Sequence, residues 1–477
     1  MTKRILSMLL ALSMALSVCP VSAFADTGWG MLSNPAAPQT VDEQNDLLSK
    51  EHQVSNDADF KQEVDAINND TSSDTLHNIY LSNSIHVTDE VTFKAGRRVQ
   101  IIGNGHTINF SVNGTLKVSG AELALSNVCL DGQSQIRCAP GVTVESGGTL
   151  KMEKNSCIQN FTNSASNGSG GGVYAGSGST MTMNGGTIKD CSASDGGGIY
   201  AAGTVVLNGG TISGCKAVGS YRSGGGIYIG PSGSLTMGGG SIESCTASNW
   251  GGGVFAHGTF ELTGGSITDC SALSGGGVHI SNATTTLNGG TISNCKATRG
   301  GGVYIAGNDG SILEMKNGSI TDCEATGDTS RLMGGGVYIN NRMTMTGGSI
   351  TGCKADVGGG IYNYHTLTLT SGTVCNNTAK TQGADIYLGS WMSSTSLLDA
   401  ADLRHHRQQD RRLVQRCLRC ALHPRPRRHP GGCENIDPKY GSRGQLPYPL
   451  DHYGKRRYSQ CGRHHRDRSQ KGRNGDH

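Results

Sequence analysis

The chain has 477 residues, and its 73 glycines make up about 15% of it, against roughly 7% in an average protein. Only 35% of the residues are hydrophobic, and a long apolar run occurs only near the start, which excludes a multi-span membrane protein. The net charge of +3 is the sum of an acidic and a basic segment. Residues 1–403 carry 21 Lys and Arg against 31 Asp and Glu, whereas residues 404–477 carry 19 Lys and Arg against 6 Asp and Glu.

The first 25 residues have the layout of a secretory signal peptide. Lys3 and Arg4 precede an apolar stretch over 5–18, and an Ala-Phe-Ala cleavage site follows at 23–25. The apolar stretch is short and is broken by serines, which argues against a transmembrane anchor. We therefore expect a mature chain without a transmembrane segment that is secreted or held at the cell surface.

Residues 26–56 are predicted to be a disordered linker, followed by a short helix within residues 57–76. Phe60, Val64 and Ile67 are spaced for one helical face, and the acidic residues Asp57 and Asp59 stand at its start. Such a helix would cap the open end of the structure that follows and cover its strand edges.

Glycine is periodic in the body of the chain. Triplets begin at 170, 196, 224, 251, 275, 300, 334 and 358, with separations from 24 to 34 residues. An apolar-aromatic-apolar tripeptide follows each triplet, and a second run then alternates apolar and polar residues, as at Val205 and Leu207. A third element reads Gly-Gly-Thr/Ser-Ile and ends in Cys and Ala, as over 209–217. Alternation with period two predicts strands.

Three short strands in each repeat of about 27 residues have no hairpin turns to join them, so each must pair with its equivalent in the next repeat. This predicts an all-β fold, a right-handed single-stranded parallel β-helix, over residues 77–403. The segment from His77 to Ile108 reads as its opening coils. A ninth repeat begins near Ile386, but the sequence shows no alternating strand after it.

The GG[ST]I and GGG[IV]Y repeats resemble those of secreted pectin-lyase-like β-helix proteins of Gram-positive bacteria and of the chlamydial polymorphic outer-membrane protein family. The Gly-Gly-apolar motif of the latter is matched well, and its Phe-x-x-Asn motif poorly. The resemblance covers roughly residues 77–400. It implies a secreted or surface protein of adhesin-like character.

One position of the repeat is cysteine in seven coils, which we call the cysteine column: Cys191, Cys215, Cys245, Cys270, Cys295, Cys323 and Cys353. Asn160 and Asn377 are predicted to hold this position in the flanking coils. Coils about 4.8 Å apart would permit disulfides in a secreted chain. Seven cysteines cannot all pair with one another, however, and side chains stacked in one column point in the same direction rather than toward each other. Both facts argue against disulfides within the column. We therefore expect mainly reduced, buried thiols of structural role, and no metal, since no His accompanies them.

A second position is almost always aromatic, which we call the aromatic column: Tyr174, Tyr200, Tyr228, Phe255, Tyr304, Tyr338 and Tyr362, with His279 in one coil. Its members lie between inward-facing residues, which predicts that they point outward on one face. Two roles are open. The column could stabilise adjacent strands, or it could bind a glycan or a host or matrix protein.

Pectate lyases and polygalacturonases share this fold, so a carbohydrate-active enzyme, either a polysaccharide lyase or a glycoside hydrolase, is the alternative function. Their chemistry needs clustered carboxylates, or a base with calcium or arginine. Asp190, Asp269 and Asp322 recur before the cysteine column but lie coils apart. His106 and Asp131 lie in irregular coils that could hold a site. We predict a monomeric, non-catalytic adhesin without catalytic residues, cofactor or metal.

Residues 404–477 form a basic tail with 16 arginines. The tail could bind an anionic polymer such as nucleic acid. We favour a disordered or frame-shifted segment and expect no nucleic-acid partner. The spacing of Cys417, Cys420, His423 and Cys433 matches zinc ligands superficially, and in so His-rich a stretch we attribute the match to chance.

Overall fold

The computed structural model of the protein describes residues 49–72, 74–308, 310–327, 331–389 and 394–397. The predicted signal peptide over 1–25 and the predicted tail over 404–477, with its Cys and His residues, lie outside the described residues. Most of the predicted linker over 26–56 also lies outside them.

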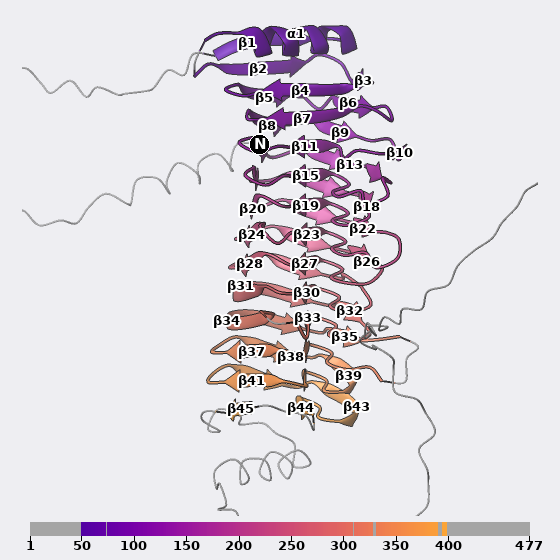
Figure 1. The fold of residues 1–477 in the computed structure, drawn as a ribbon, viewed down its shortest axis with the longest axis vertical. Helices are drawn as coiled ribbons and strands as arrows, with labels where there is room; N and C mark the ends of the chain where they lie inside the picture. The colour runs from indigo at the N-terminus through magenta and orange to yellow at the C-terminus, as the bar shows by residue number, and fades with distance from the viewer. Residues whose placement is uncertain (1–48, 73, 309, 328–330, 390–393, 398–477) are drawn as a thin grey trace, which may run out of the picture. The chain divides into compact units, whose positions relative to one another are not determined.

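The described residues wind into a parallel β-solenoid of about 13 turns with a repeat of about 26 residues (Figure 1). Strands pair with their equivalents in the turns before and after, and the pairs are parallel and in register, as with Val205 and Leu235. The predicted parallel β-helix is therefore confirmed. Each inward position becomes a column of like side chains stacked along the solenoid.

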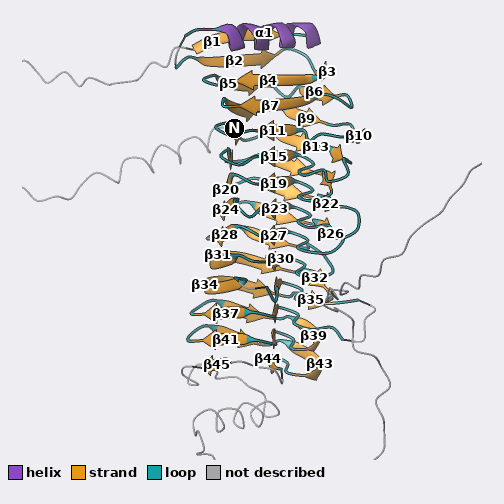
Figure 2. Ribbon diagram, in the orientation of Figure 1, coloured by secondary structure: helices purple, strands orange, loops and turns teal. Residues whose placement is uncertain are grey.

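One helix, α1 (Asp57–Asn69), covers the N-terminal end of the solenoid, as Figure 2 shows. Asn56 caps it, because its side-chain oxygen accepts the backbone N–H of Asp59 at 3.1 Å. Phe60, Val64 and Ile67 are buried beneath it. The predicted capping helix is thus present.

A strand that the sequence analysis missed comes just before the helix. β1 (Ser49–Val54) pairs in parallel with β2 (Leu76–Leu81), so these residues are not the linker that was predicted for them. Five of its six residues are polar or charged, and only Val54 is fully buried. The free edge of β2 therefore sets its conformation, rather than its own hydrophobic pattern.

The opening coils contain the following strands: β2, β3 (Ile85–Val87), β4 (Glu90–Lys94), β5 (Arg98–Ile102), β6 (Thr107–Phe110), β7 (Thr115–Ser119), β8 (Glu122–Ser126), β9 (Cys129–Asp131), β10 (Ile136–Arg137), β11 (Val142–Val144), β12 (Thr149–Met152), β13 (Cys157–Gln159) and β14 (Thr162–Asn163). Large side chains fill their interior, among them Phe93, Phe110 and Phe161.

From residue 170 onward the coils are regular, and each of the eight glycine triplets leads into a first strand: β15 (Val173–Ala175), β19 (Ile199–Ala201), β23 (Ile227–Ile229), β27 (Val254–Ala256), β30 (Val278–Ile280), β33 (Val303–Ile305), β36 (Val337–Ile339) and β40 (Ile361–Asn363). A ninth first strand, β44 (Ile386–Leu388), follows Gly383, Ala384 and Asp385. The second strands carry the alternating run: β16 (Thr180–Met183), β20 (Thr204–Leu207), β24 (Ser234–Met237), β28 (Thr259–Leu262), β37 (Arg342–Met345), β41 (Thr366–Leu369) and β45 (Ser394–Leu397).

The third strands carry the buried isoleucine of the Gly-Gly-Thr/Ser-Ile element: β17 (Thr187–Lys189), β21 (Thr211–Ser213), β25 (Ser241–Glu243), β29 (Ser266–Thr268), β38 (Ser349–Thr351) and β42 (Thr373–Cys375), the last with Val374 in its place. In two turns the second and third strands form one continuous strand: β31 (Thr284–Ser293) and β34 (Ile312–Thr321). A short fourth strand, not separated in the sequence analysis, follows the cysteine: β18 (Ser192–Ala193), β22 (Lys216–Ala217), β26 (Thr246–Ala247), β32 (Lys296–Ala297), β35 (Glu324–Ala325), β39 (Lys354–Val357) and β43 (Thr378–Gln382).

The glycine triplets stack on one another where the chain turns between faces. The first glycine of a triplet is left-handed, with φ of +64° at Gly251. A Cβ atom on the second, Gly252, would lie 2.4 Å from the carbonyl oxygen of Ser271. No side chain fits there, so the corner requires glycine in the eight turns that carry a triplet, and Ala384 holds the equivalent position in the last described turn.

The last described turn extends beyond the prediction. β45 (Ser394–Leu397) pairs with β41, although no strand was expected after Ile386. The prediction was wrong because Ser-Thr-Ser-Leu carries too little apolar alternation to indicate a strand from the sequence.

Candidate functional site

The aromatic column occupies the middle of each first strand. Its neighbours on either side, such as Val173 and Ala175 around Tyr174, are buried in the core. The side chain between them therefore points away from the core, as predicted. The in-register pairing of the first strands brings each ring beside the next, and Tyr387 of β44 extends the column.

The rings of this column stack face to face. Centroids of neighbouring rings lie from 4.8 Å, for Tyr200 and Tyr228, to 5.4 Å, for Tyr174 and Tyr200, and the planes of Tyr338 and Tyr362 differ by only 3°. Both faces of an inner ring are therefore occupied by its neighbours. Only ring edges and hydroxyl groups remain for contacts with other molecules.

The column is less exposed than an outward stripe would be. Phe255, His279, Tyr338 and Tyr362 are each 5–8% exposed. They are covered on one flank by a second column in the corner before the triplets: Ser223, Trp250, Ser274, Arg299, Met333 and Val357, joined by single β-bridges. The expectation of an exposed aromatic stripe is thus wrong for these members.

Burial keeps the column uncharged. It raises the pKa of the Tyr228 hydroxyl to about 12 and lowers the pKa of His279 to about 3. Burial likewise raises the pKa of Tyr200 and Tyr304. At neutral pH the column therefore presents neutral hydroxyl groups and one neutral imidazole.

An exposed aromatic group lies on the flank of the column, in the turn of Tyr228 and Phe255. The ring of Tyr221 lies 6.2 Å from that of Trp250, and Trp250 in turn lies 6.4 Å from Phe255 and 6.1 Å from His279. Tyr221 is 70% exposed. We call Tyr221, Arg222 and Trp250 the platform.

The backbone of Tyr221 is held in an unfavourable conformation. Its φ is +59°, in the left-handed region that a bulky residue rarely adopts. The side-chain oxygen of Asn249 in the next turn accepts the Tyr221 backbone N–H at 2.9 Å and helps to hold this conformation. Strain of this kind collects at functional sites, because the surrounding structure must keep it there.

Arg222 is tied to the same corner. Its Nη1 lies 3.6 Å from Oδ2 of Asp195 in the preceding turn, and its Nη2 donates to the carbonyl of Ser166 at 3.2 Å. Burial raises the pKa of Asp195, although the hydrogen bond from the Ser223 backbone and the charge of Arg222 oppose that rise. The guanidinium is therefore held by Asp195 and Ser166, while the backbone of Arg222 directly follows the exposed Tyr221.

The sequence carries a signal for the platform that was not used. In most repeats two or three residues separate the alanine of the fourth strand from the next triplet, but six do so over 218–223 and eight over 326–333. The first insertion contributes Tyr221 and Arg222, and the second contributes Arg331, which lines a cavity with Tyr362 and Tyr387. The unequal triplet spacing marked both insertions.

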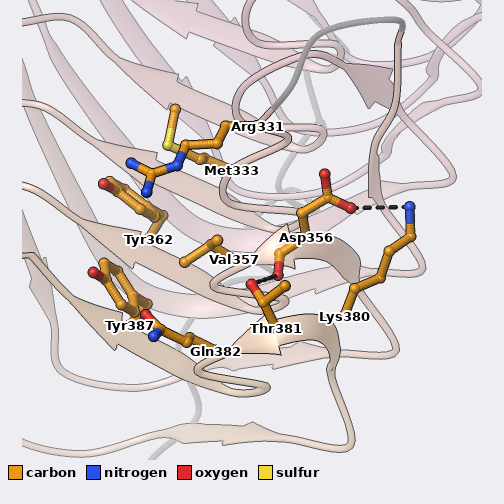
Figure 3. A pocket seen from close by; sticks show the side chains of 9 residues that line it. All are labelled: Arg331, Met333, Asp356, Val357, Tyr362, Lys380, Thr381, Gln382 and Tyr387. Atoms are coloured by element: carbon orange, nitrogen blue, oxygen red, sulfur yellow. Dashed lines mark hydrogen bonds and ion pairs between the residues drawn. The ribbon is translucent and has the colours of Figure 1, made fainter. Parts of the chain in front are cut away.

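A cavity of about 530 Å³ lies beside the last two rings of the aromatic column, Tyr362 and Tyr387 (Figure 3). Tyr362 and Tyr387 form one wall, and Arg331 lies above them. Across the cavity Lys380 pairs with Asp356 at 2.9 Å, which lowers the pKa of that carboxyl group. The cavity thus combines aromatic and charged groups.

The cysteine column is buried in the core. All seven members are free thiols without measurable exposure. Sγ of Cys215 lies 3.4 Å from the carbonyl oxygen of Ser213, the last residue of β21, and 3.8 Å from the carbonyl oxygen of Ile188 in the preceding turn. Burial raises the pKa of the Cys191 thiol. The third glycine of each triplet packs against this column, since a Cβ on Gly198 would approach Cys215 Sγ to 3.3 Å.

The assignment of Asn160 to the cysteine column is wrong. Gln159 pairs with Lys189, so Asn160 aligns with Asp190 and Phe161 takes the cysteine position. Asn160 is left-handed, with φ of +60°, like Asp190 at +53°. A short polar side chain suits that corner, whereas the interior position can be filled by any apolar group of suitable volume. Asn377 does occupy the cysteine position, as predicted, because Thr351 pairs with Cys375.

A disulfide that the sequence analysis did not predict joins Cys129 and Cys157 in the opening coils. The two residues are register partners on β9 and β13, with Cα atoms 4.4 Å apart. Their side chains point away from the core, unlike those of the cysteine column.

The acidic residues considered for catalysis have structural surroundings. The backbones of Asp190, Asp269 and Asp322 each adopt a positive φ, in the left-handed region, at a corner of the solenoid. They lie two or three turns apart, roughly 10 Å or more at about 4.8 Å per turn, farther than the carboxylate pair of a glycosidase. The Asp131 carboxylate accepts bonds from Gln159 and from the Gln133 backbone at 2.7 Å each. In the described part of the chain no cluster of three or more His, Cys, Asp or Glu could hold a metal.

Comparison with known proteins places one region in a named class. Residues 51–186 match a family model described as "Putative pectate lyase-like adhesive domain". The resemblance to pectin-lyase-like surface proteins is thereby confirmed for the opening coils and the first repeat. No curated protein and no solved structure matches the chain. Within the described residues no helix is long and apolar enough to cross a membrane.

Proposed function

We propose that the chain is a secreted or surface-displayed adhesin that binds a glycan or a host or matrix protein through the platform, without catalysis. One observation carries this proposal. Tyr221 is 70% exposed, strained in the left-handed region and packed near Trp250. A large exposed aromatic ring beside an arginine is the usual composition of an energetic centre in a binding surface.

The aromatic column and the platform have different roles in this proposal. Stacking occupies both faces of the inner rings, so Tyr200, Tyr228, Phe255, Tyr304, Tyr338 and Tyr362 cannot stack on sugar rings within the column. Tyr174, the first ring, has one face against Tyr200 and pairs with Thr143 in the preceding turn. These rings stiffen the face, and the tyrosines among them add hydroxyl groups along it. Tyr221 has an accessible ring and supplies the stacking contact.

An adhesive role agrees with the family description over residues 51–186. Such a role implies an extracellular location, which is part of the proposal. The match ends before the platform. The description therefore supports adhesion as a class, and the assignment of the contact surface rests on the geometry of Tyr221, Arg222 and Trp250.

The proposal is tested with the full-length chain on an array of neutral and uronate polysaccharides and of matrix proteins such as collagen and fibronectin. The Tyr221→Ser variant should lose binding at least tenfold, because a central aromatic contact contributes about 2 kcal/mol or more. Val112→Ser is the matched control, since Val112 is also an exposed apolar residue, at 48%, but lies in the opening coils. Equal loss in both variants would contradict the proposal.

The same polysaccharides are incubated with the protein, with and without calcium, and examined for unsaturated or hydrolysed products. We expect binding without any product. Release of product would replace adhesion by the carbohydrate-active enzyme considered in the sequence analysis.

A further inference from the structure

The cavity beside Tyr362 and Tyr387 lies at a corner of the solenoid, between the first strands that carry these rings and the fourth strands β39 and β43 (Figure 3). Its lining includes Met333, Val357 and Gln382, and Val357 and Gln382 are register partners in neighbouring turns. A volume of about 530 Å³ is ordinary for a pocket that holds a small ligand. The corner therefore has room for a ligand.

The wall formed by the two tyrosines offers hydroxyl groups and aromatic surface. The ring centroids of Tyr362 and Tyr387 lie 5.0 Å apart, and Tyr387 is only partly buried. Within the described residues Tyr387 is the last ring of the aromatic column, and Tyr362 is the only ring that stacks on it. A phenolic hydroxyl both donates and accepts hydrogen bonds, and the ring supplies a flat apolar surface. This wall therefore suits a ligand with rings and many hydroxyl groups.

The charged residues that line the cavity give it an excess of positive charge. Two of them are cationic, Arg331 and Lys380, and one is acidic, Asp356. Nζ of Lys380 lies 2.9 Å from Oδ1 of Asp356, and Oδ2 of the same carboxylate accepts the backbone N–H of Leu332 at 3.3 Å. Both oxygens of this carboxylate therefore have a partner inside the protein.

A further cation acts on the same wall. Burial raises the pKa of the Tyr362 hydroxyl, and the charges of Arg331 and Arg299 oppose that rise. Arg299 precedes the glycine triplet at 300, on the flank of the aromatic column. Two arginines therefore contribute positive potential at the tyrosine wall, and a ligand that carries a negative charge is favoured there.

The platform differs from the cavity in this respect. The residue immediately before the triplet at 196 is Asp195, and Nη1 of Arg222 lies 3.6 Å from its Oδ2. Beside the cavity the residues at the same position of the repeat are Met333 and Val357, which are apolar. The insertion over 218–223 thus pairs its arginine with an acid of the corner, whereas the insertion over 326–333 brings Arg331 to an apolar corner. The two sites therefore suit ligands of different charge.

We propose that the cavity is a second binding site, separate from the platform, and that it takes an acidic saccharide whose carboxylate or sulfate group binds Arg331. A guanidinium has five N–H groups in a planar fork that matches the oxygens of either anion. The hydroxyl groups of the saccharide bind those of Tyr362 and Tyr387 and the side-chain amide of Gln382, which both donates and accepts. An acidic peptide would match the charge alone. This site goes beyond the proposed function, which needs only the platform.

The test is calorimetric titration of the full-length protein with short saccharides of matched structure. The sulfated probe is the disaccharide of keratan sulfate, and its neutral counterpart is N-acetyllactosamine. The carboxylated probe is a hyaluronan tetrasaccharide. At least one acidic probe should bind about tenfold more tightly than N-acetyllactosamine, because a charged group strengthens its hydrogen bonds with the arginine. The tighter acidic probe identifies the anionic group, and its affinity should fall when sodium chloride is raised to about 0.5 M.

Two matched variants locate the site. Arg331→Met should lower the affinity for the tighter acidic probe about tenfold, because it removes the charged donor. Arg342→Met is the control, since Arg342 is also exposed but lies on β37, in the second-strand face. It should lower the affinity less than about twofold. Arg331 is an exposed residue of an insertion, so its substitution leaves the core intact. Tyr221→Ser should bind the acidic probe as the unmodified protein does.

Several outcomes would overturn this second site. One is that neither acidic probe binds more tightly than N-acetyllactosamine, and another is that a hexaglutamate peptide binds as tightly as the saccharides. Equal losses in Arg331→Met and Arg342→Met would show a general effect of charge. Loss of the acidic probe in Tyr221→Ser would assign that ligand to the platform. If Tyr221→Ser loses the array ligands while Arg331→Met keeps the acidic probe, the platform is retained and the cavity site is refuted.

Discussion

The opening coils over 49–163 and the regular coils over 170–389 build the same solenoid by different means. The opening coils use individual contacts: large interior side chains, a disulfide between Cys129 and Cys157, and ion pairs such as Lys117 with Glu145 at 2.8 Å. The regular coils use repetition. In them glycine, isoleucine, cysteine and an aromatic ring recur at fixed positions of each turn.

The difference teaches where each region tolerates change. In the regular coils any one residue matters through its column, so a substitution is felt by the turns above and below it. In the opening coils a residue matters through its own partners. Four substitutions sharpen this comparison.

The largest effect is expected in a glycine corner. Gly252→Ala would place a Cβ 2.4 Å from the Ser271 carbonyl oxygen, and should lower the free energy of unfolding by about 3 kcal/mol or more. Gly238→Ala is the matched control, because its Cβ would meet its nearest atom at 3.7 Å. Urea unfolding of both variants measures the difference, and similar losses would contradict the role given to the corner.

Arg137 is the residue of the opening coils that most clearly departs from the repeat rules. It is fully buried, lies 4.9 Å from the centroid of Phe161, and has no hydrogen-bond partner for its guanidinium nitrogens. Its burial lowers its pKa to about 10. Arg137→Met should raise the free energy of unfolding by about 2 kcal/mol, since it removes a desolvated charge. If the Arg137→Met variant instead loses more stability than a conservative core substitution does, the charge of Arg137 stabilises the folded protein.

His279 breaks the aromatic column by its chemistry. Its pKa is lowered to about 3 by burial, whereas the unfolded residue titrates near 6.5. The unfolded chain therefore binds a proton first as the pH falls, and stability that is complete above pH 6.5 is lost below it. At pH 5 the loss is about 2 kcal/mol. His279→Tyr should remove this pH-dependent part of the free energy of unfolding, which is measured by urea unfolding at pH 7 and at pH 5. If the difference between the two pH values is the same in the variant, His279 is not its cause.

The smallest effect is expected at the platform. Tyr221→Gly relieves the left-handed strain and should change the free energy of unfolding by about 1 kcal/mol in the stabilising direction, while binding is lost. Thermal unfolding and binding are measured on the same preparation. A variant that binds normally would show that the strain at Tyr221 has no functional purpose.

Regular features of the fold could be predicted from the sequence because they repeat. The triplets, the alternating second strands and the helix with Phe60, Val64 and Ile67 have patterns that arise from local geometry. β1 could not be predicted in this way, since its polar residues become a strand only through the edge of β2. Asn160 was assigned to the cysteine position one residue out of register, because Phe161, which holds that position, differs in type from the cysteines it aligns with.

Only part of the candidate site could be predicted from the sequence, for a related reason. The aromatic column repeats, so its position and direction could be predicted. Its burial depends on Trp250, Arg299 and Met333, which share a position but no residue type. Tyr221 belongs to the insertion over 218–223, which the unequal triplet spacing marks, but the insertion over 326–333 holds no aromatic residue, so periodicity alone could not single out Tyr221.

The central claim is that the platform binds and the aromatic column supports it. The most direct test is the affinity of the full-length chain for the strongest array ligand, compared between Tyr221→Ser and a double variant, Tyr200→Phe with Tyr228→Phe, which keeps the stacked rings but removes two hydroxyl groups. We predict at least a tenfold loss for Tyr221→Ser and less than about a twofold loss for the double variant. The reverse order, or unchanged affinity in Tyr221→Ser, would contradict the claim.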